Sequence, residues 1–249
     1  MNGGTPPAIA FREVSRSFSS RAVLNNVSFE VTPGEAFCLL GRSGMGKSVT
    51  LKLAIGLIQP DAGAIYVEND NIVGMGEDGL SKVRSRIGSL FQSAALFDSF
   101  SLHDNLAVPL KRFWEKKPDE EIKTIVQKNL DDVGLGKDGS KMPAELSGGM
   151  RKRAGLARAL MLSPSILLVD EPVSGLDRVT ASEIDDLLLR VRERDNTTMM
   201  IVTHDTREAR RVGDRVGVLD NGNLIAVGSM DELATNKSAL VRALVSEAE

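Results

Sequence analysis

The chain is poor in cysteine, in long apolar runs and in net charge, and each shortage narrows what it can be. Its single cysteine, Cys38, excludes a disulfide within the chain. No apolar run approaches the roughly 18 residues that span a bilayer. A net charge of −3 gives no electrostatic case for nucleic acid, so no such partner is expected. The start, Met1–Ala10, lacks the basic and apolar segments of a signal peptide. We therefore expect a cytoplasmic protein that meets a membrane only through a partner.

The most informative segment that is present is a phosphate-loop motif. The whole chain has 249 residues, 42% hydrophobic and 26% charged, which suffice for one large globular domain. Within it, the run Gly41-Arg42-Ser43-Gly44-Met45-Gly46-Lys47-Ser48 fits G-x-x-x-x-G-K-[ST] at every fixed position. The apolar run 36–40 predicts a buried strand before the loop, and 49–57 predicts a helix after it. In that context the glycines let backbone N–H groups surround a polyphosphate, while Lys47 reaches the β- and γ-phosphates and Ser48 holds Mg²⁺.

A second motif is the run Ile166-Leu167-Leu168-Val169-Asp170-Glu171-Pro172. Its four apolar residues place Asp170 at the carboxyl end of a central strand, where ligands bind in open α/β sheets. There Asp170 can hold Mg²⁺ through water, opposite Ser48. Glu171 can accept a proton from a water that attacks the phosphate. Taken alone, the pair could also be two solvated acids before a proline turn.

A third motif is Leu146-Ser147-Gly148-Gly149-Met150. Ser147 can cap a helix that starts near Met150, and the two glycines expose backbone donors at its positive end. This predicts a second anion site, although for the motif taken alone an ordinary capped helix is the favoured interpretation. The basic run that follows, Arg151-Lys152-Arg153, favours a solvated helix face or a phosphate-proximal cluster over a nucleic-acid site.

Strand and helix patterns alternate along the chain, which predicts an α/β fold. The expected class is a P-loop core with a parallel sheet, an N-terminal antiparallel β region and an inserted α-helical subdomain. Strands are expected within 9–31 and over 64–67, 87–91, 166–169 and 198–202, and helices over 120–133 and 180–194. We expect one domain over 1–249: a loose tail at 1–8, core at 9–91 and 159–230, helical subdomain at 92–158 and C-terminal helical tail at 231–249.

In this order the three motifs resemble the nucleotide-binding subunit of an ATP-binding cassette (ABC) transporter, over residues 9–230. The resemblance implies ATP and Mg²⁺ as cofactors, with residues 41–49, including Val49, around the nucleotide. It assigns Gln92 to Mg²⁺ and the attacking water, His204 to the γ-phosphate and Phe18 to the adenine, with Phe11 and Phe29 as competitors for that place. It also matches Asp177, at the end of Ser174-Gly175-Leu176-Asp177, to the loop that follows the catalytic strand. Met150 and Arg178 depart from the residues usual in the family, and neither removes a phosphate ligand.

The resemblance also implies partners. In that family two cassettes pair head to tail, so Ser147, Gly148 and Gly149 would contact the ATP held by a second copy of the chain. The apolar stretch Gln92–Phe113 would dock a transmembrane permease.

Segments 91–101, 104–110 and 145–160 resemble the Mla/Mce-type phospholipid transport ATPases. That resemblance implies a lipid transporter on the cytoplasmic face of the inner membrane, with an Mce-type lipid-binding partner. Two alternatives stay open: the ATPase of a polar-solute importer, such as one for amino acids, and a soluble cassette of DNA repair or translation. The last class usually carries a coiled-coil insertion or two cassettes in tandem, and this chain has one copy of each motif.

Overall fold

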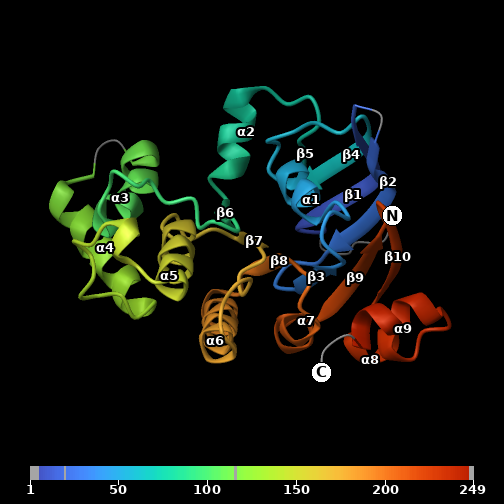
Figure 1. Ribbon diagram of the computed structural model, residues 1–249. Coiled ribbons are helices and arrows are strands. Elements are labelled where there is room, and N and C mark those ends of the chain that lie inside the picture. The colour runs from blue at the N-terminus through green and yellow to red at the C-terminus, as the bar shows by residue number, and fades with distance from the viewer. Residues whose placement is uncertain (1–5, 20, 115–116, 247–249) are drawn as a thin grey trace.

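Two β-sheets organise the fold in the computed structural model, which describes residues 6–19, 21–114 and 117–246 (Figure 1). The strands are β1 (Ile9–Phe18), β2 (Arg21–Val31), β3 (Ala36–Leu40), β4 (Ala62–Val67), β5 (Asp70–Asn71), β6 (Ile87–Leu90), β7 (Ile166–Asp170), β8 (Thr198–Thr203), β9 (Arg215–Asp220) and β10 (Asn223–Gly228). The helices are α1 (Lys47–Ala54), α2 (Glu77–Arg84), α3 (Leu102–Phe113), α4 (Asp119–Asp132), η1 (Pro143–Glu145), α5 (Gly148–Ala159), α6 (Arg178–Asp195), α7 (Thr206–Val212), α8 (Met230–Ala234) and α9 (Ala239–Ser246).

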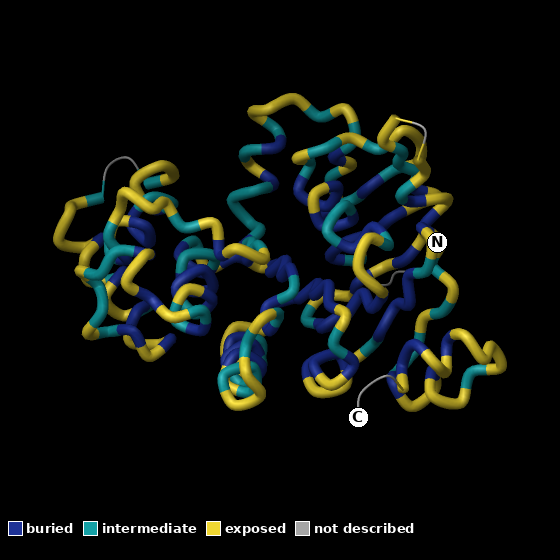
Figure 2. Tube along the Cα trace, in the orientation of Figure 1, coloured by how far each residue is buried: buried dark blue, intermediate teal, exposed yellow. Residues whose placement is uncertain are grey.

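The larger sheet has the order β10-β9-β3-β8-β7-β6. Its neighbours are parallel except for β10, which runs antiparallel to β9. Every residue of β3, β7 and β8 is buried, which explains their continuous apolar sequences (Figure 2). Because the strands are parallel, the carboxyl ends of β3, β6, β7 and β8 share one edge of the sheet. The phosphate loop, Gln92, Glu171 and His204 follow these four strands.

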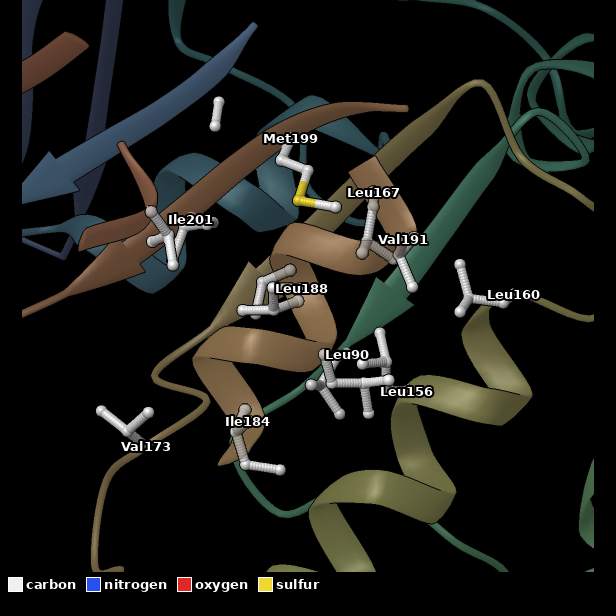
Figure 3. Packing of buried hydrophobic residues seen from close by; sticks show 14 of the residues in the cluster. Leu90, Leu156, Leu160, Leu167, Val173, Ile184, Leu188, Val191, Met199 and Ile201 are labelled. Carbon is white, nitrogen blue, oxygen red and sulfur yellow. The ribbon is translucent and has the colours of Figure 1, made fainter. Parts of the chain in front are cut away.

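Side chains of successive residues in the central strands point to opposite faces of the sheet and so belong to two separate hydrophobic cores. One core contains Cys38, Leu167 and Ile201 and includes buried residues of the inserted helices α3, α4 and α5 and of α6. In Figure 3 the side chains of Leu156 in α5 and of Leu160, the residue after α5, lie beside those of α6 and beside Leu90 of β6. Cys38 is fully buried, as expected for a small hydrophobe, and burial raises the pKa of its thiol.

The other core joins the larger sheet to a four-stranded antiparallel sheet of order β2-β1-β4-β5. A column of three stacked rings crosses it: Phe11 and Phe29 have centroids 4.7 Å apart, and Phe29 and Phe37 5.1 Å. The antiparallel pairing of β1 with β2 and β4 confirms the β region predicted at the N-terminus. The expected loose tail ends before Ala8, which is buried and donates its N–H to Val31 at 2.8 Å, and residues 1–5 lie outside the described part.

The helices α3, α4 and α5 lie at one end of the molecule, away from the four-stranded sheet (Figure 1). In α4 the residues Ile122, Val126 and Leu130 form the buried face that their spacing predicts. Between residues 92 and 158 the described chain, which omits 115–116, contains helices and no strand. The expected α/β fold class is therefore confirmed.

Several element boundaries differ from the predictions by one to three residues. The helix after the phosphate loop begins at Lys47 and ends at Ala54, because Gly46 at φ +103° and Gly56 at φ +65° set its two ends. The signature helix α5 begins at Gly148, directly after its cap Ser147, and not at Met150. The strand expected at 64–67 begins at Ala62, where it pairs with β1.

The C-terminal tail forms α8 and α9, whose buried residues include Leu233, Val241 and Leu244. Leu240 does not share that face, because its side chain is 45% exposed.

Candidate functional site: a nucleotide site at the carboxyl edge of the sheet

The phosphate loop connects β3 to the first turn of α1. Gly46 caps the helix with a left-handed backbone, and a Cβ there would lie 2.7 Å from the Val23 carbonyl, so only glycine fits. Lys47 is 4% exposed, and its ammonium donates to the Gly41 carbonyl at 2.6 Å and the Arg42 carbonyl at 3.1 Å. Burial lowers the pKa of Lys47, and the nearby Glu171 carboxylate opposes this shift. The loop thus presents backbone donors and one buried cation at the positive end of a helix.

A cavity of about 450 Å³ opens beside this loop. It is lined by Phe18, Val23, Gln92 and Glu171, together with the loop residues Ser43, Gly44, Gly46, Lys47, Ser48 and Val49. Phe18 is 41% exposed, and the Arg16 guanidinium lies 4.7 Å from its ring centre. Its competitors Phe11 and Phe29 are buried in the core, which leaves Phe18 as the aromatic beside the phosphate loop.

An adjoining cavity of about 420 Å³ is lined by the rest of the site. Gly41, Arg42 and Ser43 meet Gln92, Glu171 and His204 there, together with Leu40, Ser174 and Leu244. The side chain of Met45 lines neither cavity; it packs against the second core. Gln92, two residues after the end of β6, lines both cavities.

Ser48 and Asp170 come together as a candidate magnesium site. The Ser48 hydroxyl donates to Asp170 Oδ1 at 3.0 Å, and Asp170 is 6% exposed. Burial raises the pKa of Asp170, an effect that a bound cation would offset. The described residues contain no cluster of three or more His, Cys, Asp or Glu side chains able to hold a metal alone. This donor set fits Mg²⁺, which takes one or two protein oxygens and completes its shell with phosphates and water.

Glu171 lies at the centre of the charged groups. Its Oε2 lies 3.0 Å from His204 Nδ1 and its Oε1 lies 3.5 Å from Lys47 Nζ. The Glu171 side chain is 14% exposed and that of His204 is 54% exposed, so this carboxylate faces the cavity from a sheltered position. A carboxylate so placed can take a proton from a water beside the phosphate loop.

The signature residues 146–150 pack against the start of α6 and the segment before it, and they do not line the two cavities. Ser147 is exposed and accepts the Met150 N–H at 3.2 Å. A Cβ at Gly149 would lie 2.4 Å from Thr180 Cγ2, and one at Gly148 would lie 3.4 Å from Leu176. Asp177 caps α6 by accepting from Val179 and Thr180, and the bonds from Thr180 lower its pKa. Among the described residues that line the two cavities, none belongs to the signature 146–150.

Comparisons with known proteins agree with this geometry. Residues 24–174 match the family described as ABC transporter. A probable ribonucleotide transport ATP-binding protein, mkl, of Mycobacterium leprae (strain TN) is 43% identical over 94% of this chain and 67% of its own length. The chain belongs to the ABC transporter family. The cassette spans 65% of the related mkl protein of Mycobacterium tuberculosis (strain ATCC 25618 / H37Rv), also 43% identical over 94% of this chain.

Another relative carries a different transport name. The methionine import ATP-binding protein MetN of Caulobacter vibrioides is 37% identical over 97% of the cassette and 73% of its own length. Among solved structures, the dimeric ATP-binding cassette MJ0796, bound to ADP and Pi, superposes with a TM-score of 0.83 at 30% identity. That superposition covers 89% of this chain and 98% of MJ0796. As a member of this family the cassette is an ATPase that takes ATP with Mg²⁺.

Two features of the cassette correct or extend the sequence analysis. Of the two interpretations of the basic run, the solvated helix face is wrong for Lys152, which is 6% exposed and donates to the Glu171 carbonyl at 2.8 Å. Its spacing of four residues from Leu156, another buried residue of α5, was the available signal. Arg158 of the same helix donates to the Ala94 and Ala95 carbonyls beside Gln92, a role that no pattern in the sequence indicates. In the described residues, no helix has the length and apolarity needed to cross a membrane.

Proposed function

We propose that this chain powers a transporter by hydrolysing ATP between two copies of itself, with Glu171 as the proton acceptor. The observation that carries the proposal is the position of Glu171, within 3.0 Å of His204 and 3.5 Å of the phosphate-loop lysine. The phosphate loop, with Ser43 to Val49, binds the phosphates, and Phe18 stacks on the adenine. Ser48 and Asp170 hold Mg²⁺, aided by Gln92, and the ion neutralises phosphate charge.

In the hydrolytic step a water attacks the γ-phosphorus and the bond to the bridging oxygen of ADP breaks. Glu171 accepts the proton of that water, and Lys47 stabilises charge on the phosphate oxygens. His204 contacts the γ-phosphate and holds the Glu171 carboxylate through Nδ1. Phosphoryl transfer requires little beyond such positioning and charge stabilisation.

The second half of each site comes from a second copy. Ser147, Gly148 and Gly149 stand at the start of α5 and do not line their own chain's cavities, so they are placed to contact the ATP of a partner chain. A two-fold dimer presents each patch twice and so completes two sites. The dimeric form of the similar MJ0796 cassette supports this arrangement.

The permease is proposed to dock on the stretch from Gln92 to Phe113. Three of its aromatic side chains are exposed: Phe97 by 50%, Phe100 by 41% and Phe113 by 37%. Exposed apolar side chains gathered in one segment indicate a contact surface for another protein. Through this permease the chain would lie on the cytoplasmic face of the inner membrane.

We propose a phospholipid or another hydrophobic molecule as the substrate, carried with an Mce-type lipid-binding partner. The support is the resemblance of segments 91–101, 104–110 and 145–160 to the phospholipid transport ATPases. A polar-solute importer is the second candidate, because MetN of C. vibrioides is 37% identical over 97% of the chain. Purification of the membrane complex followed by lipid analysis separates them: enriched phospholipid and an Mce-type subunit support the first, and a solute-binding subunit without lipid supports the second.

The direct test of the catalytic proposal is Glu171→Gln, which keeps the size of the side chain and removes the proton acceptor. We expect phosphate release to fall by about 10²-fold or more, because a positioned general base contributes that much. ATP binding should persist and the ATP-bound dimer should accumulate, as measured by size-exclusion chromatography with light scattering. Lys47→Ala is the contrasting variant, which should lose both binding and hydrolysis. Wild-type turnover in Glu171→Gln would remove Glu171 from this role.

A further inference from the structure

Lys152 is a buried cation that the mechanism above does not use. It lies on α5 five residues after Ser147, with 6% of its surface exposed. Burying an ammonium is costly unless it is paired and hydrogen-bonded. Its Nζ donates to the backbone carbonyl of Glu171 at 2.8 Å. Burial lowers the pKa of Lys152, while the nearby carboxylates of Asp170, Glu208 and Glu171 oppose that shift.

The peptide that Lys152 contacts has an uncommon conformation. Glu171 has φ +45°, in the left-handed region, which costs about 1 kcal/mol for a residue with a Cβ. Its N–H donates to the Val202 carbonyl of β8 at 2.9 Å, and its carbonyl also accepts the Ser174 N–H at 3.3 Å. The Lys152 bond is shorter than the Ser174 bond and comes from a different element of the fold. Strained backbone persists only where its surroundings hold it in place.

We propose that Lys152 is a positioning residue for Glu171, tying the helix that carries the signature to the peptide that aims the catalytic carboxylate. The inference rests on the proposed function, in which Glu171 accepts the proton. By fixing the Glu171 carbonyl, Lys152 fixes the direction in which the side chain leaves the backbone, toward His204 and Lys47. A misplacement of about 1 Å in such a group can cost 10²-fold in rate.

This contact also joins two different ATP sites. In the proposed dimer the signature at the start of α5 serves the ATP of the partner, while Glu171 serves the ATP of its own chain. Lys152 lies on α5, the helix that carries the signature, and donates to the backbone carbonyl of Glu171. Engagement of one ATP by the signature would thus bear, through α5, on the position of the base at the other site.

The test compares Lys152→Met, which keeps the length and removes the donor, with Lys152→Arg, which keeps the charge and the donors. We expect Lys152→Met to lower kcat about tenfold or more while KM for ATP stays within about twofold, because substrate binding does not use this contact. Lys152→Arg should recover most of the rate. Lys137→Met, the same change at an exposed lysine of the helical part, is the matched control and should behave as wild type.

A purely structural role would give a different pattern. It would lower the melting temperature and raise KM together with the fall in kcat, and that result overturns the proposal, as does a kcat for folded Lys152→Met within twofold of wild type. If Lys152→Met is recovered unfolded, Lys152→Gln replaces it; a lower kcat at unchanged KM supports the proposal and a wild-type kcat overturns it.

The Glu171→Gln background separates the two proposals. There Lys152→Met should cause no further loss of hydrolysis and leave the ATP-bound dimer intact, and a loss of that dimer would overturn the positioning role. Wild-type turnover in Glu171→Gln alone overturns the function proposed for Glu171. An inactive Glu171→Gln beside a fully active Lys152→Met overturns only the inference about Lys152.

Discussion

Phe18 shows how much one residue's surroundings decide about its role. The sequence offers three phenylalanines in the first two strands, and pattern alone makes each of them a core residue. The pleat sends Phe11 and Phe29 into the core, whereas Phe18, at the end of β1, is 41% exposed and lines the cavity beside the phosphate loop. An exposed ring at that place is suited to stack on a base.

We expect Phe18→Ala to weaken ATP binding by about 1–3 kcal/mol, the usual contribution of a base stacked on an aromatic side chain. The melting temperature should change little, because the side chain is not buried. Titration with a fluorescent ATP analogue measures the affinity, and Phe18→Tyr should retain it. Phe100→Ala is the control, since Phe100 is also 41% exposed but lies outside both cavities. Equal ATP affinities in Phe18→Ala and wild type would show that the adenine does not stack on Phe18.

At the residue scale, the sequence predicts the side chains that belong to recognisable motifs. It does not predict contacts that arise only from the packing of distant elements. Lys47, Ser48, Asp170 and Glu171 are predictable, because their spacing carries the chemistry. Lys152 is only partly predictable: its spacing from Leu156 indicates a buried position, although a basic run on a helix is usually solvated. Its pairing with the Glu171 carbonyl depends on how α5 packs against β6 and α6, which are long-range contacts.

At the scale of elements, the loop after β6 links the nucleotide cavity to the exposed aromatics. Ala94 and Ala95 both have a left-handed backbone, at φ +59° and +47°, and Arg158 of α5 donates to both carbonyls. The Arg158 guanidinium also lies 6.0 Å from the ring centre of Phe97. Two consecutive left-handed alanines are not foreseeable from sequence, because alanine favours the right-handed helix.

Replacing Phe97 and Phe100 by Asp should abolish assembly with the permease. Their ring centres lie 5.4 Å apart on the surface, and two carboxylates there would have to be desolvated in an apolar contact. ATP binding by the isolated chain should persist, because neither residue lines a nucleotide cavity. The measurement is co-purification from membranes. Leu57→Asp, at a residue that is 53% exposed elsewhere, is the control and should leave the complex intact. Unchanged recovery of the permease with Phe97→Asp and Phe100→Asp together would place the docking surface elsewhere.

For the whole molecule, the parallel sheet explains why motifs far apart in sequence form one site. The loops after β3, β6, β7 and β8 share one edge, so the class of fold and the members of the nucleotide site follow from the order of strands and motifs. The placement of the C-terminal helices does not follow. Leu244 of α9 lines the cavity that contains His204, and only the folded chain brings them together.

The arrangement of two copies carries the central claim, and paired mutant chains test it most directly. One chain carries Lys47→Ala and the other Ser147→Asp, which keeps a good helix cap but repels phosphate. With distinct tags, the mixed dimer is purified and its ATPase rate is compared with that of a dimer of wild type and a chain carrying both changes. If ATP is bound between the phosphate loop of one chain and the signature of the other, the first dimer retains one intact site and the second has none. The account predicts activity in the first dimer alone. Activity in the second alone would mean that each chain completes its own site, and would contradict it.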